Sequence, residues 1–440
     1  MRTPKKSALR PTSRPAVRRG DDEIWPRVTR ELADDLAFDA PVRDRAGKPP
    51  FDEVARLREA GLPSLLTPPG ASGRGADWRA ACAVIREISA ADGSIGELLA
   101  HHHVLAWSAR FLNGGEPHTA FEDGTAREGR LLAGGLGPAR TGDERDDVYE
   151  AHESARAGER TLSLTPTRGG QVLDGRRAFA SAVAVADRLV VGARCTGTGD
   201  LLIVLVDPAD PAVFVESGPE RVGQRLAGAG TVTFDQVRVE PRNVLGALPR
   251  DEHALAPFTT LAPLALRLLL VHVALGIAEG ALAEARDVSR ATRAAPVTTG
   301  SRTGAPDHPL GQDDPYLLLA YGELATAAHA AAAVVERATD ALARGLAAGR
   351  ALGVEDRADI AVLVAAAEAV TSRAAVRITT RILELVDTTG SADAPGGGPG
   401  FDRFWRNARA LTAQSSPAHR LRDIGDHYLH GTRPGLRLLA

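Results

Sequence analysis

Few residue clusters in this sequence could perform chemistry by themselves, and a run of three histidines, His101, His102 and His103, comes first among them. Three imidazoles suggest a metal site, but adjacent residues on a helix point about 100° apart and cannot all face one ion. His427 and His430 have the i, i+3 spacing of helical ligands, which is also common on solvated helix faces. We therefore expect no metal site at either place.

Two cysteines, Cys82 and Cys195, lie far apart in the 440 residues. They offer neither a disulfide framework nor a CxxC motif, which fits a reducing compartment, and we expect a cytoplasmic protein. The 53 Lys and Arg residues nearly balance the 56 Asp and Glu residues, giving a net charge of −3. Such a composition argues against a nucleic-acid partner.

The first 22 residues are basic, and no apolar segment of a secretory signal follows them. We expect a disordered basic tail over 1–22. The longest apolar run, from Leu261 to Ala278, contains Arg267 and His272 near its middle. It therefore predicts a buried core helix and no membrane association.

Hydrophobic periodicity divides the rest of the chain into three parts. Residues 23–130 have a helical period, and Ser94 and Glu97 have the spacing of a capping box. Residues 131–248 have a period of two, with Asp174-Gly175 as a turn signal, which predicts a middle antiparallel β-barrel domain.

Residues 249–440 are predicted to form a C-terminal four-helix bundle. The expected helices cover 261–288, 315–349, 358–387 and 401–429, the last one broken at Pro417. Long loops over 292–312 and 388–400 separate them. The alanine-rich face of 317–348 exceeds what one bundle needs, which indicates an oligomer.

Specific motifs then point to a family. They are Leu57-Arg58-Glu59-Ala60-Gly61-Leu62, Ala91-Asp92-Gly93-Ser94, the histidine run, Arg177-Ala178-Phe179-Ala180-Ser181, Gly223-Gln224-Arg225-Leu226, Gly228-Ala229-Gly230-Thr231-Val232 and Asp402-Arg403-Phe404-Trp405-Arg406-Asn407-Ala408-Arg409. Together they resemble the acyl-CoA dehydrogenase superfamily, in its reduced-flavin-dependent monooxygenase branch related to dibenzothiophene and sulfone monooxygenases and to 4-hydroxyphenylacetate hydroxylase.

The resemblance implies a mainly helical α+β fold with an N-terminal helical domain, a middle antiparallel β domain and a C-terminal four-helix bundle. It implies the oxygenase component of a two-component flavin monooxygenase. In that branch a separate flavin reductase supplies reduced FMN or FAD, O₂ gives a C4a-hydroperoxyflavin, and a small organic substrate is oxygenated at sulfur, nitrogen or an activated carbon. It also implies a homotetramer.

Two other functions stay open beside this one. An acyl-CoA dehydrogenase needs a carboxylate base, but the chain has no Glu after Glu384, and Leu266-Arg267 stands where the resemblance would place a Glu-Arg pair. A non-catalytic relative that serves as a scaffold is the second alternative.

The resemblance also assigns site residues. Ser181 matches the position whose hydroxyl or backbone faces flavin N5, which implies a catalytic and a cofactor-binding role. Arg302 matches an arginine that reaches the flavin phosphate. His102 or His103 faces the flavin pocket; we expect His102 to be catalytic and His103 to bind cofactor. In the C-terminal block we expect the cofactor to be bound by Arg406, Asn407 and Arg409.

The sequence departs from the branch at two positions. Gln414 stands where the branch places a histidine between flavin and substrate, and Gly137 stands where it often has an asparagine. A glutamine cannot take up a proton near neutral pH. Phenol hydroxylation, which a base assists, is therefore disfavoured, whereas Gln414 could still donate a hydrogen bond during oxygenation of a nucleophilic sulfur or amine.

Overall fold

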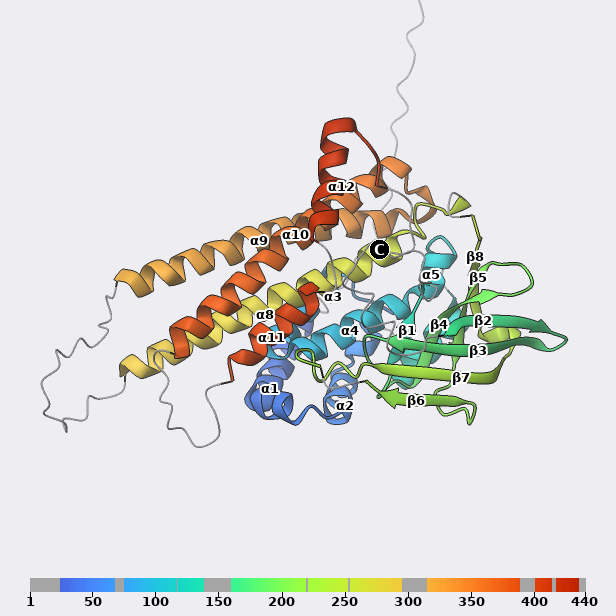
Figure 1. Cartoon of the computed structure of the whole chain (residues 1–440), viewed down its shortest axis with the longest axis horizontal. Coiled ribbons are helices and arrows are strands. Elements are labelled where there is room, and N and C mark those ends of the chain that lie inside the picture. The colour runs from blue at the N-terminus through green and yellow to red at the C-terminus, as the bar shows by residue number, and fades with distance from the viewer. Residues whose placement is uncertain are drawn as a thin grey trace, which may run out of the picture.

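The computed structural model describes residues 24–67, 75–116, 118–137, 160–218, 221–251, 254–294, 315–387, 400–413 and 417–434. Within these residues a helical region and a sheet lie side by side, with long helices extending away from the sheet (Figure 1). The tail expected over 1–22 and nearly all of the two expected long loops lie outside the described residues.

Short helices make up the N-terminal region, and α4 forms its buried centre. They are α1 (Ile24–Ala46), α2 (Phe51–Glu59), the 3-10 turn η1 (Leu62–Ser64), α3 (Trp78–Ala91), α4 (Gly93–Ala106), α5 (Ser108–Leu112) and α6 (Thr119–Glu128). The carboxylate of Asp92 accepts hydrogen bonds from the backbone N–H groups of Ser94, at 3.0 Å, and Ile95, at 3.4 Å. Asp92 is thus the N-cap of α4, and the capping box expected from Ser94 and Glu97 is wrong.

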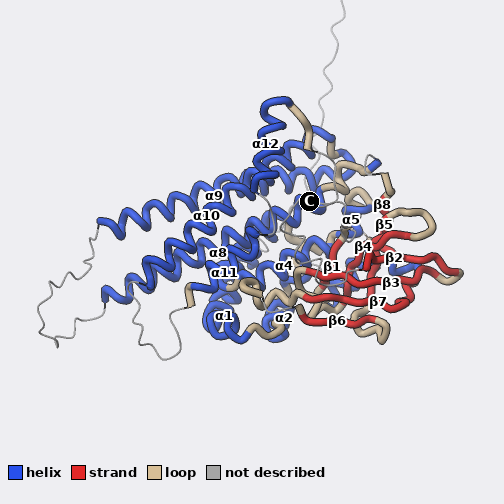
Figure 2. Tube along the Cα trace, in the orientation of Figure 1, coloured by secondary structure: helices blue, strands red, loops and turns tan. Residues whose placement is uncertain are grey.

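The middle region is one sheet. Its strands are β1 (Leu132–Gly135), β2 (Arg160–Thr167), β3 (Gly170–Phe179), β4 (Arg188–Cys195), β5 (Leu201–Val206), β6 (Val213–Ser217), β7 (Gly230–Val239) and, after the 3-10 turn η2 (Pro241–Asn243), β8 (Val244–Leu248). They follow the order β6-β7-β3-β2-β4-β5-β8, with β1 paired to β4 (Figure 2). Both β1 and β2 run parallel to β4, so the expectation of a purely antiparallel domain is wrong.

Two further details of the sheet differ from expectation. Asp174-Gly175 is not a turn but a bulge inside β3, where Gly175 has a φ of 131° that favours glycine. Among the described strands, β6 and β8 end the hydrogen-bonded path, and no recorded pairing closes it into a barrel. The division into domains at 130/131 and 248/249 stays a prediction.

The C-terminal helices are α8 (Leu261–Ala294), α9 (Pro315–Ala348), α10 (Val354–Asp387), α11 (Asp402–Ala413) and α12 (Pro417–His430), with the 3-10 turn η4 (Gly349–Ala351) before α10. Pro417 begins α12, so the predicted break between two last helices is confirmed. The third long helix starts at Val354, four residues before the predicted start. The small residues permit close packing: a Cβ at Gly280 of α8 would lie 2.0 Å from the carbonyl oxygen of Ala90 on α3.

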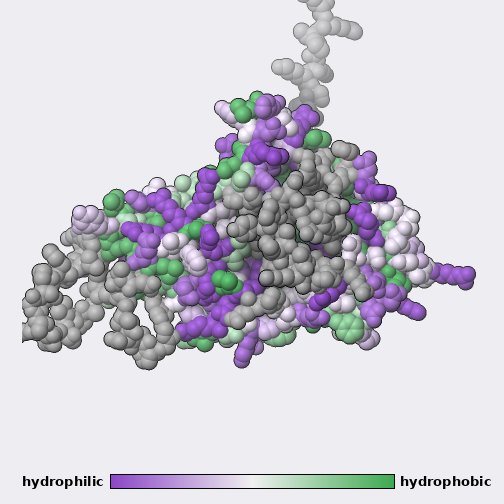
Figure 3. All heavy atoms as spheres, in the orientation of Figure 1, coloured by the Kyte–Doolittle hydropathy of each residue, from purple (hydrophilic) through white to green (hydrophobic). Residues whose placement is uncertain are grey.

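Two of these helices, α8 and α9, are long and apolar enough to cross a membrane by length and composition alone. In α8, 78% of the apolar window is buried inside the protein, as in a core helix. In α9 only 33% is buried. On the face drawn in Figure 3, hydrophobic and hydrophilic residues are interspersed over the helical region.

Candidate active site

Four segments that carry the sequence motifs meet at one junction: α4, the turn over 180–184 after β3, the loop over 221–229 before β7, and α11. The backbone N–H of Gln224 donates to Asn407 Oδ1 at 2.7 Å, and the N–H of Leu226 donates to Ser94 Oγ at 3.4 Å. The loop is therefore held to α11 on one side and to α4 on the other.

Arg406 braces the same loop from α11. Its guanidinium donates to the carbonyl oxygen of Val222 at 2.9 Å and to Asp402 Oδ2 at 3.1 Å, and it also forms an ion pair with the buried Asp44 of α1. Burial alone would lower the pKa of Arg406, but these carboxylates outweigh burial and raise it. A Cβ at Gly223 would lie 2.1 Å from the Arg406 carbonyl oxygen, so only glycine fits there.

Ser181 lies at the start of the turn that follows β3. Its hydroxyl donates to the carbonyl oxygen of Ala227 at 3.1 Å, and the N–H of Ala182 donates to the same oxygen at 2.7 Å. Ala182 has a φ of 64°, an unusual conformation for alanine that fixes the turn. The described residues provide no acceptor for the Ser181 N–H, which leaves that amide, rather than the hydroxyl, for a ligand.

His102 has both ring nitrogens occupied by backbone. Nδ1 accepts from the N–H of Leu132 at 3.0 Å, so Nε2 carries the proton and donates to the carbonyl oxygen of Pro63 at 2.8 Å. Burial lowers the pKa of His102 to about 4. His102 therefore joins α4 to η1 and to β1, and this geometry argues against the catalytic role expected for it.

Three other buried side chains at or beside the junction have no hydrogen-bond partner among the described residues. They are both ring nitrogens of His103, both oxygens of Glu97 and the side-chain amide of Gln224, all fully buried. Burial, and then the neighbouring His102, hold the pKa of His103 well below its usual value, so the ring is neutral. Gln224 also has a φ of 56°. Unpaired buried polar groups are rare in folded proteins, and each needs an explanation such as a bound ligand or water.

These orphaned groups fit an isoalloxazine ring, whose nitrogens and carbonyl oxygens offer both donors and acceptors. The expectation for His103 agrees with this geometry and stays a prediction. From the sequence, Gln224 is only part of a family motif and Glu97 is expected only to cap a helix. Sequence reasoning therefore missed both as residues of the junction. For Glu97 a signal existed, since it is a lone charge between Ile95 and Leu98-Leu99.

The remaining expected residues are placed as follows. Asn407 holds the Gln224 backbone, Arg409 is exposed on α11, and Arg302 and Gln414 lie outside the described residues. Their predicted roles toward the cofactor stay predictions. Gly137 follows β1, and its carbonyl oxygen accepts from Arg177 Nη1 at 2.5 Å.

The two histidines of α12 are each bonded to another group of the same region. His427 is bonded to the carbonyl oxygen of Thr432 and His430 to Asp426, each at 3.0 Å. Over the ranges that the structure describes, no group of three potential ligands converges.

Glu368, a buried carboxylate in the bundle, is paired with two arginines. Arg267 of α8 donates through Nε to Glu368 of α10 at 2.9 Å, and Arg420 Nε lies 3.4 Å from the same oxygen. Two guanidinium groups thus hold the Glu368 carboxylate in ion pairs, so it is not the free carboxylate base that a dehydrogenase needs.

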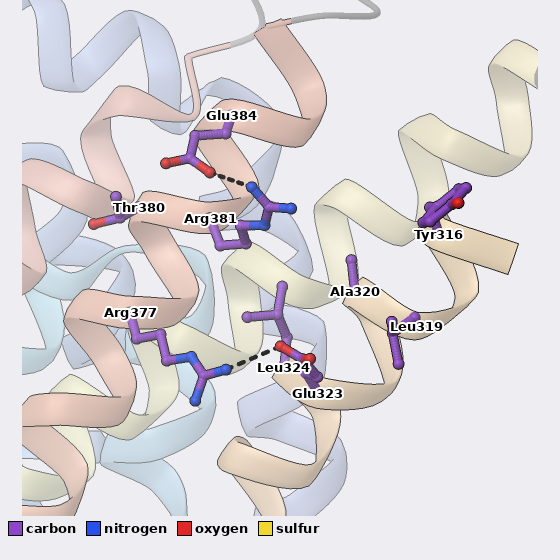
Figure 4. Close-up of a pocket in the computed structure, with 9 residues that line it drawn as sticks. All are labelled: Tyr316, Leu319, Ala320, Glu323, Leu324, Arg377, Thr380, Arg381 and Glu384. Atoms are coloured by element: carbon purple, nitrogen blue, oxygen red, sulfur yellow. Dashed lines mark hydrogen bonds and ion pairs between the residues drawn. The ribbon is translucent and has the colours of Figure 1, made fainter. Parts of the chain in front are cut away.

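A groove of 510 Å³ lies between the first turns of α9 and the last turns of α10, at the end of the bundle away from the sheet (Figures 1 and 4). Figure 4 shows two ion pairs along it, Arg377 with Glu323 and Arg381 with Glu384. Because these charges neutralise one another at the surface, the groove lacks the free reactive groups that the junction has.

The fold and this junction define a class. The sequence matches the family description "Acyl-CoA dehydrogenase, N-terminal domain" over residues 21–117 and "Acyl-CoA dehydrogenase, C-terminal domain" over residues 268–416. The two matches agree with the order of elements along the chain, in which helical regions precede and follow the strands of the sheet.

Relatives narrow the class. A dibenzothiophene monooxygenase of Rhodococcus qingshengii is 32% identical over 92% of this chain and 93% of its own length. A probable FMNH2-dependent monooxygenase of Pseudomonas putida is 29% identical over 92% and 95%. The crystal structure of a Paenibacillus dibenzothiophene monooxygenase is similar, with a TM-score of 0.79 and 28% identity over 95% of this chain and 100% of that one. The chain belongs to the acyl-CoA dehydrogenase superfamily, in its flavin-dependent monooxygenase branch, which confirms the predicted family and fold.

Proposed function

We propose that this chain is the oxygenase component of a two-component system that uses reduced FMN, supplied by a separate reductase, and O₂ to oxygenate a small organic molecule. The observation that carries the proposal is the match over nearly the whole length of both chains to enzymes named as flavin-dependent monooxygenases. Leu266 stands where the resemblance would place the glutamate of a dehydrogenase, and the neighbouring Arg267 pairs with Glu368, which supports the proposal against a dehydrogenase.

FMN is the proposed flavin because one relative is described as FMNH2-dependent and the Paenibacillus enzyme has an FMN-bound structure. Bound reduced flavin would supply the two electrons that activate O₂. On the protein side, the Ser181 N–H, His103 and the Gln224 amide would bind the ring, and Arg302 and Arg409 would approach its phosphate. Asn407 and Arg406 would keep the loop in place and exclude water.

We propose sulfur as the reacting atom of the substrate, with nitrogen next. Relatives are named for dibenzothiophene and for methanesulfinate, and the Paenibacillus enzyme forms a complex with FMN and indole. A nucleophilic sulfur needs no base to react with an oxygen electrophile, so Gln414 in place of histidine is compatible with this substrate class.

The proposal is tested by anaerobic titration of the protein with reduced FMN, followed by O₂ consumption with dibenzothiophene, indole and methanesulfinate. Saturable binding and faster O₂ uptake with a substrate support it. No binding contradicts it, acyl-CoA-dependent dye reduction would establish the dehydrogenase instead, and equal reoxidation with or without every substrate would favour a non-catalytic protein.

Ser181→Ala is expected to weaken reduced-FMN binding less than threefold, because the backbone N–H is retained. The lost hydrogen bond to Ala227 is expected to lower the free energy of unfolding by about 1 kcal/mol. Isothermal titration and chemical unfolding measure the two effects. A loss of binding of about 100-fold would show that the hydroxyl, not the amide, contacts the ring.

We further propose a cytoplasmic homotetramer. Tyr316 and Leu319 at the start of α9 line the groove of Figure 4, and both are exposed, as is Leu318 between them in the sequence. A second copy would cover this apolar surface. Analytical ultracentrifugation is expected to give a tetramer, and Leu319→Glu to give smaller species. A monomeric wild-type protein would contradict the proposal.

A further inference from the structure

Glu97 is an acidic side chain enclosed in the first half of α4. It has no exposed surface, and its helix neighbours Ile95, Leu98 and Leu99 are also fully buried. Neither of its carboxylate oxygens has a hydrogen-bond partner among the described residues. A carboxylate in such surroundings destabilises the fold unless it is protonated or paired with an opposite charge.

Two groups face Glu97. His101, one helical turn further along α4, has Nε2 4.0 Å from Glu97 Oε1. Arg221 approaches from the loop and donates to the carbonyl oxygen of Ala180, the residue before Ser181. Burial raises the pKa of Glu97 to about 7 against the opposing charge of Arg221, while burial and then Arg221 lower the pKa of His101 to about 4.

Other charged groups on the helices around α4 form ion pairs, whereas Glu87 of α3 and Arg409 of α11 are exposed to solvent. These pairs are Arg43 with Glu53 and Asp92, Arg86 with Glu279, Arg403 with Glu284, and Arg406 with Asp44. Burial and then Arg221 therefore set the protonation of Glu97, and His101 is the titratable side chain next to it.

We propose that Glu97, with His101 beside it, is the proton-holding residue of this site and supplies the proton that the oxygen reaction consumes. This rests on the proposed function. It follows from the inventory of the junction: both nitrogens of His102 are occupied by backbone, His103 does not become charged, and Gln414 has no titratable group. Glu97 is the described junction group with open oxygens and a proton to exchange near neutral pH.

The proton balance is explicit. With FMN reduced to its anion, oxygenation is FMNH⁻ + O₂ + substrate + H⁺ → FMN + oxygenated substrate + H₂O. Without substrate it is FMNH⁻ + O₂ + H⁺ → FMN + H₂O₂. In each case bound reduced FMN would supply two electrons and one proton, the Glu97 O–H bond breaks, and the Glu97 proton forms an O–H bond of the water or peroxide. Solvent then reprotonates the carboxylate.

The first test needs no cofactor. Because the pKa of folded Glu97 lies above the unfolded value of 4.5, its proton stabilises the fold at low pH, and this stabilisation is lost as the pH rises through about 7. Between about pH 5 and pH 8 the unfolding equilibrium constant of wild type is expected to rise about 70-fold relative to that of Glu97→Gln. The exposed control Glu87→Gln on α3 should behave as wild type. A Glu97→Gln profile parallel to wild type overturns the proposal.

The second test uses reduced FMN and O₂ alone, which avoids any choice of substrate. Stopped-flow oxidation of protein-bound reduced FMN is expected to change with a midpoint near pH 7 in wild type and in Glu87→Gln. Glu97→Gln is expected to be about 100-fold slower at pH 6 and to lose that midpoint. An unchanged pH profile overturns proton delivery by Glu97. If wild type binds no reduced FMN, the proposed function fails and proton delivery fails with it. If wild type binds reduced FMN and Glu97→Gln keeps the wild-type pH profile, only proton delivery fails and the proposed function stands.

Discussion

Replacing Gly223 by alanine is expected to weaken the binding of reduced FMN by about 10- to 100-fold while the protein stays folded. The new Cβ would lie 2.1 Å from the Arg406 carbonyl oxygen, so the loop must move away from α11. Overpacking of this kind costs about 1–3 kcal/mol, and in binding each 1.4 kcal/mol is about tenfold. The shift would carry Gln224 away from its partner Asn407.

Gly425→Ala is the matched control, because a Cβ at position 425 of α12 meets no other atom within 4 Å. Anaerobic titration compares the two variants, and circular dichroism checks that both are folded. If Gly223→Ala bound reduced FMN as tightly as Gly425→Ala, the loop over 221–229 would not belong to the flavin site.

Leucine substitutions of the two adjacent histidines of α4 are expected to affect different properties, one the stability of the fold and the other the binding of reduced FMN. His102→Leu leaves the Pro63 carbonyl and the Leu132 N–H buried without partners and should lower the free energy of unfolding by about 2–5 kcal/mol. His103→Leu breaks no recorded hydrogen bond and should change stability by less than about 1 kcal/mol. It should instead weaken reduced-FMN binding about tenfold, because the ring loses a polar contact.

Chemical unfolding and FMN titration of both variants measure this pair, each variant serving as the control for the other. A stable His102→Leu protein without activity, beside a fully active His103→Leu protein, would return the catalytic role to His102 and contradict the geometry of α4.

The arrangement of elements could be predicted because it depends on local signals. The period of two over 131–248 and the break at Pro417 both reflect backbone preferences of nearby residues. The parallel pairing of β1 with β4 has no such signal, since Leu132 and Arg188 are brought together only by the path of the intervening strands. The cap of α4 was misplaced by two residues because Asp92 and Ser94 are both good capping residues.

The site was harder to predict than the fold. His102 and His103 are equivalent in the sequence, and only Pro63 and Leu132, 39 and 30 positions away, decide which ring is occupied. Likewise, nothing local to Gln224 indicates its positive φ or its bond to Asn407, which lies 183 positions along the chain. Tertiary contacts between residues so far apart in the sequence determine the chemistry that each side chain can perform.

The most direct test of monooxygenation at this junction is isotopic. Wild-type protein, reduced FMN and dibenzothiophene are mixed with isotopically heavy O₂ in ordinary water, and the product is analysed by mass spectrometry. We expect one heavy oxygen atom in each sulfoxide formed in the first turnover, and none when the label is in the water. Product oxygen that came from water, or formation of an unsaturated acyl-CoA by the same protein, would contradict the assignment.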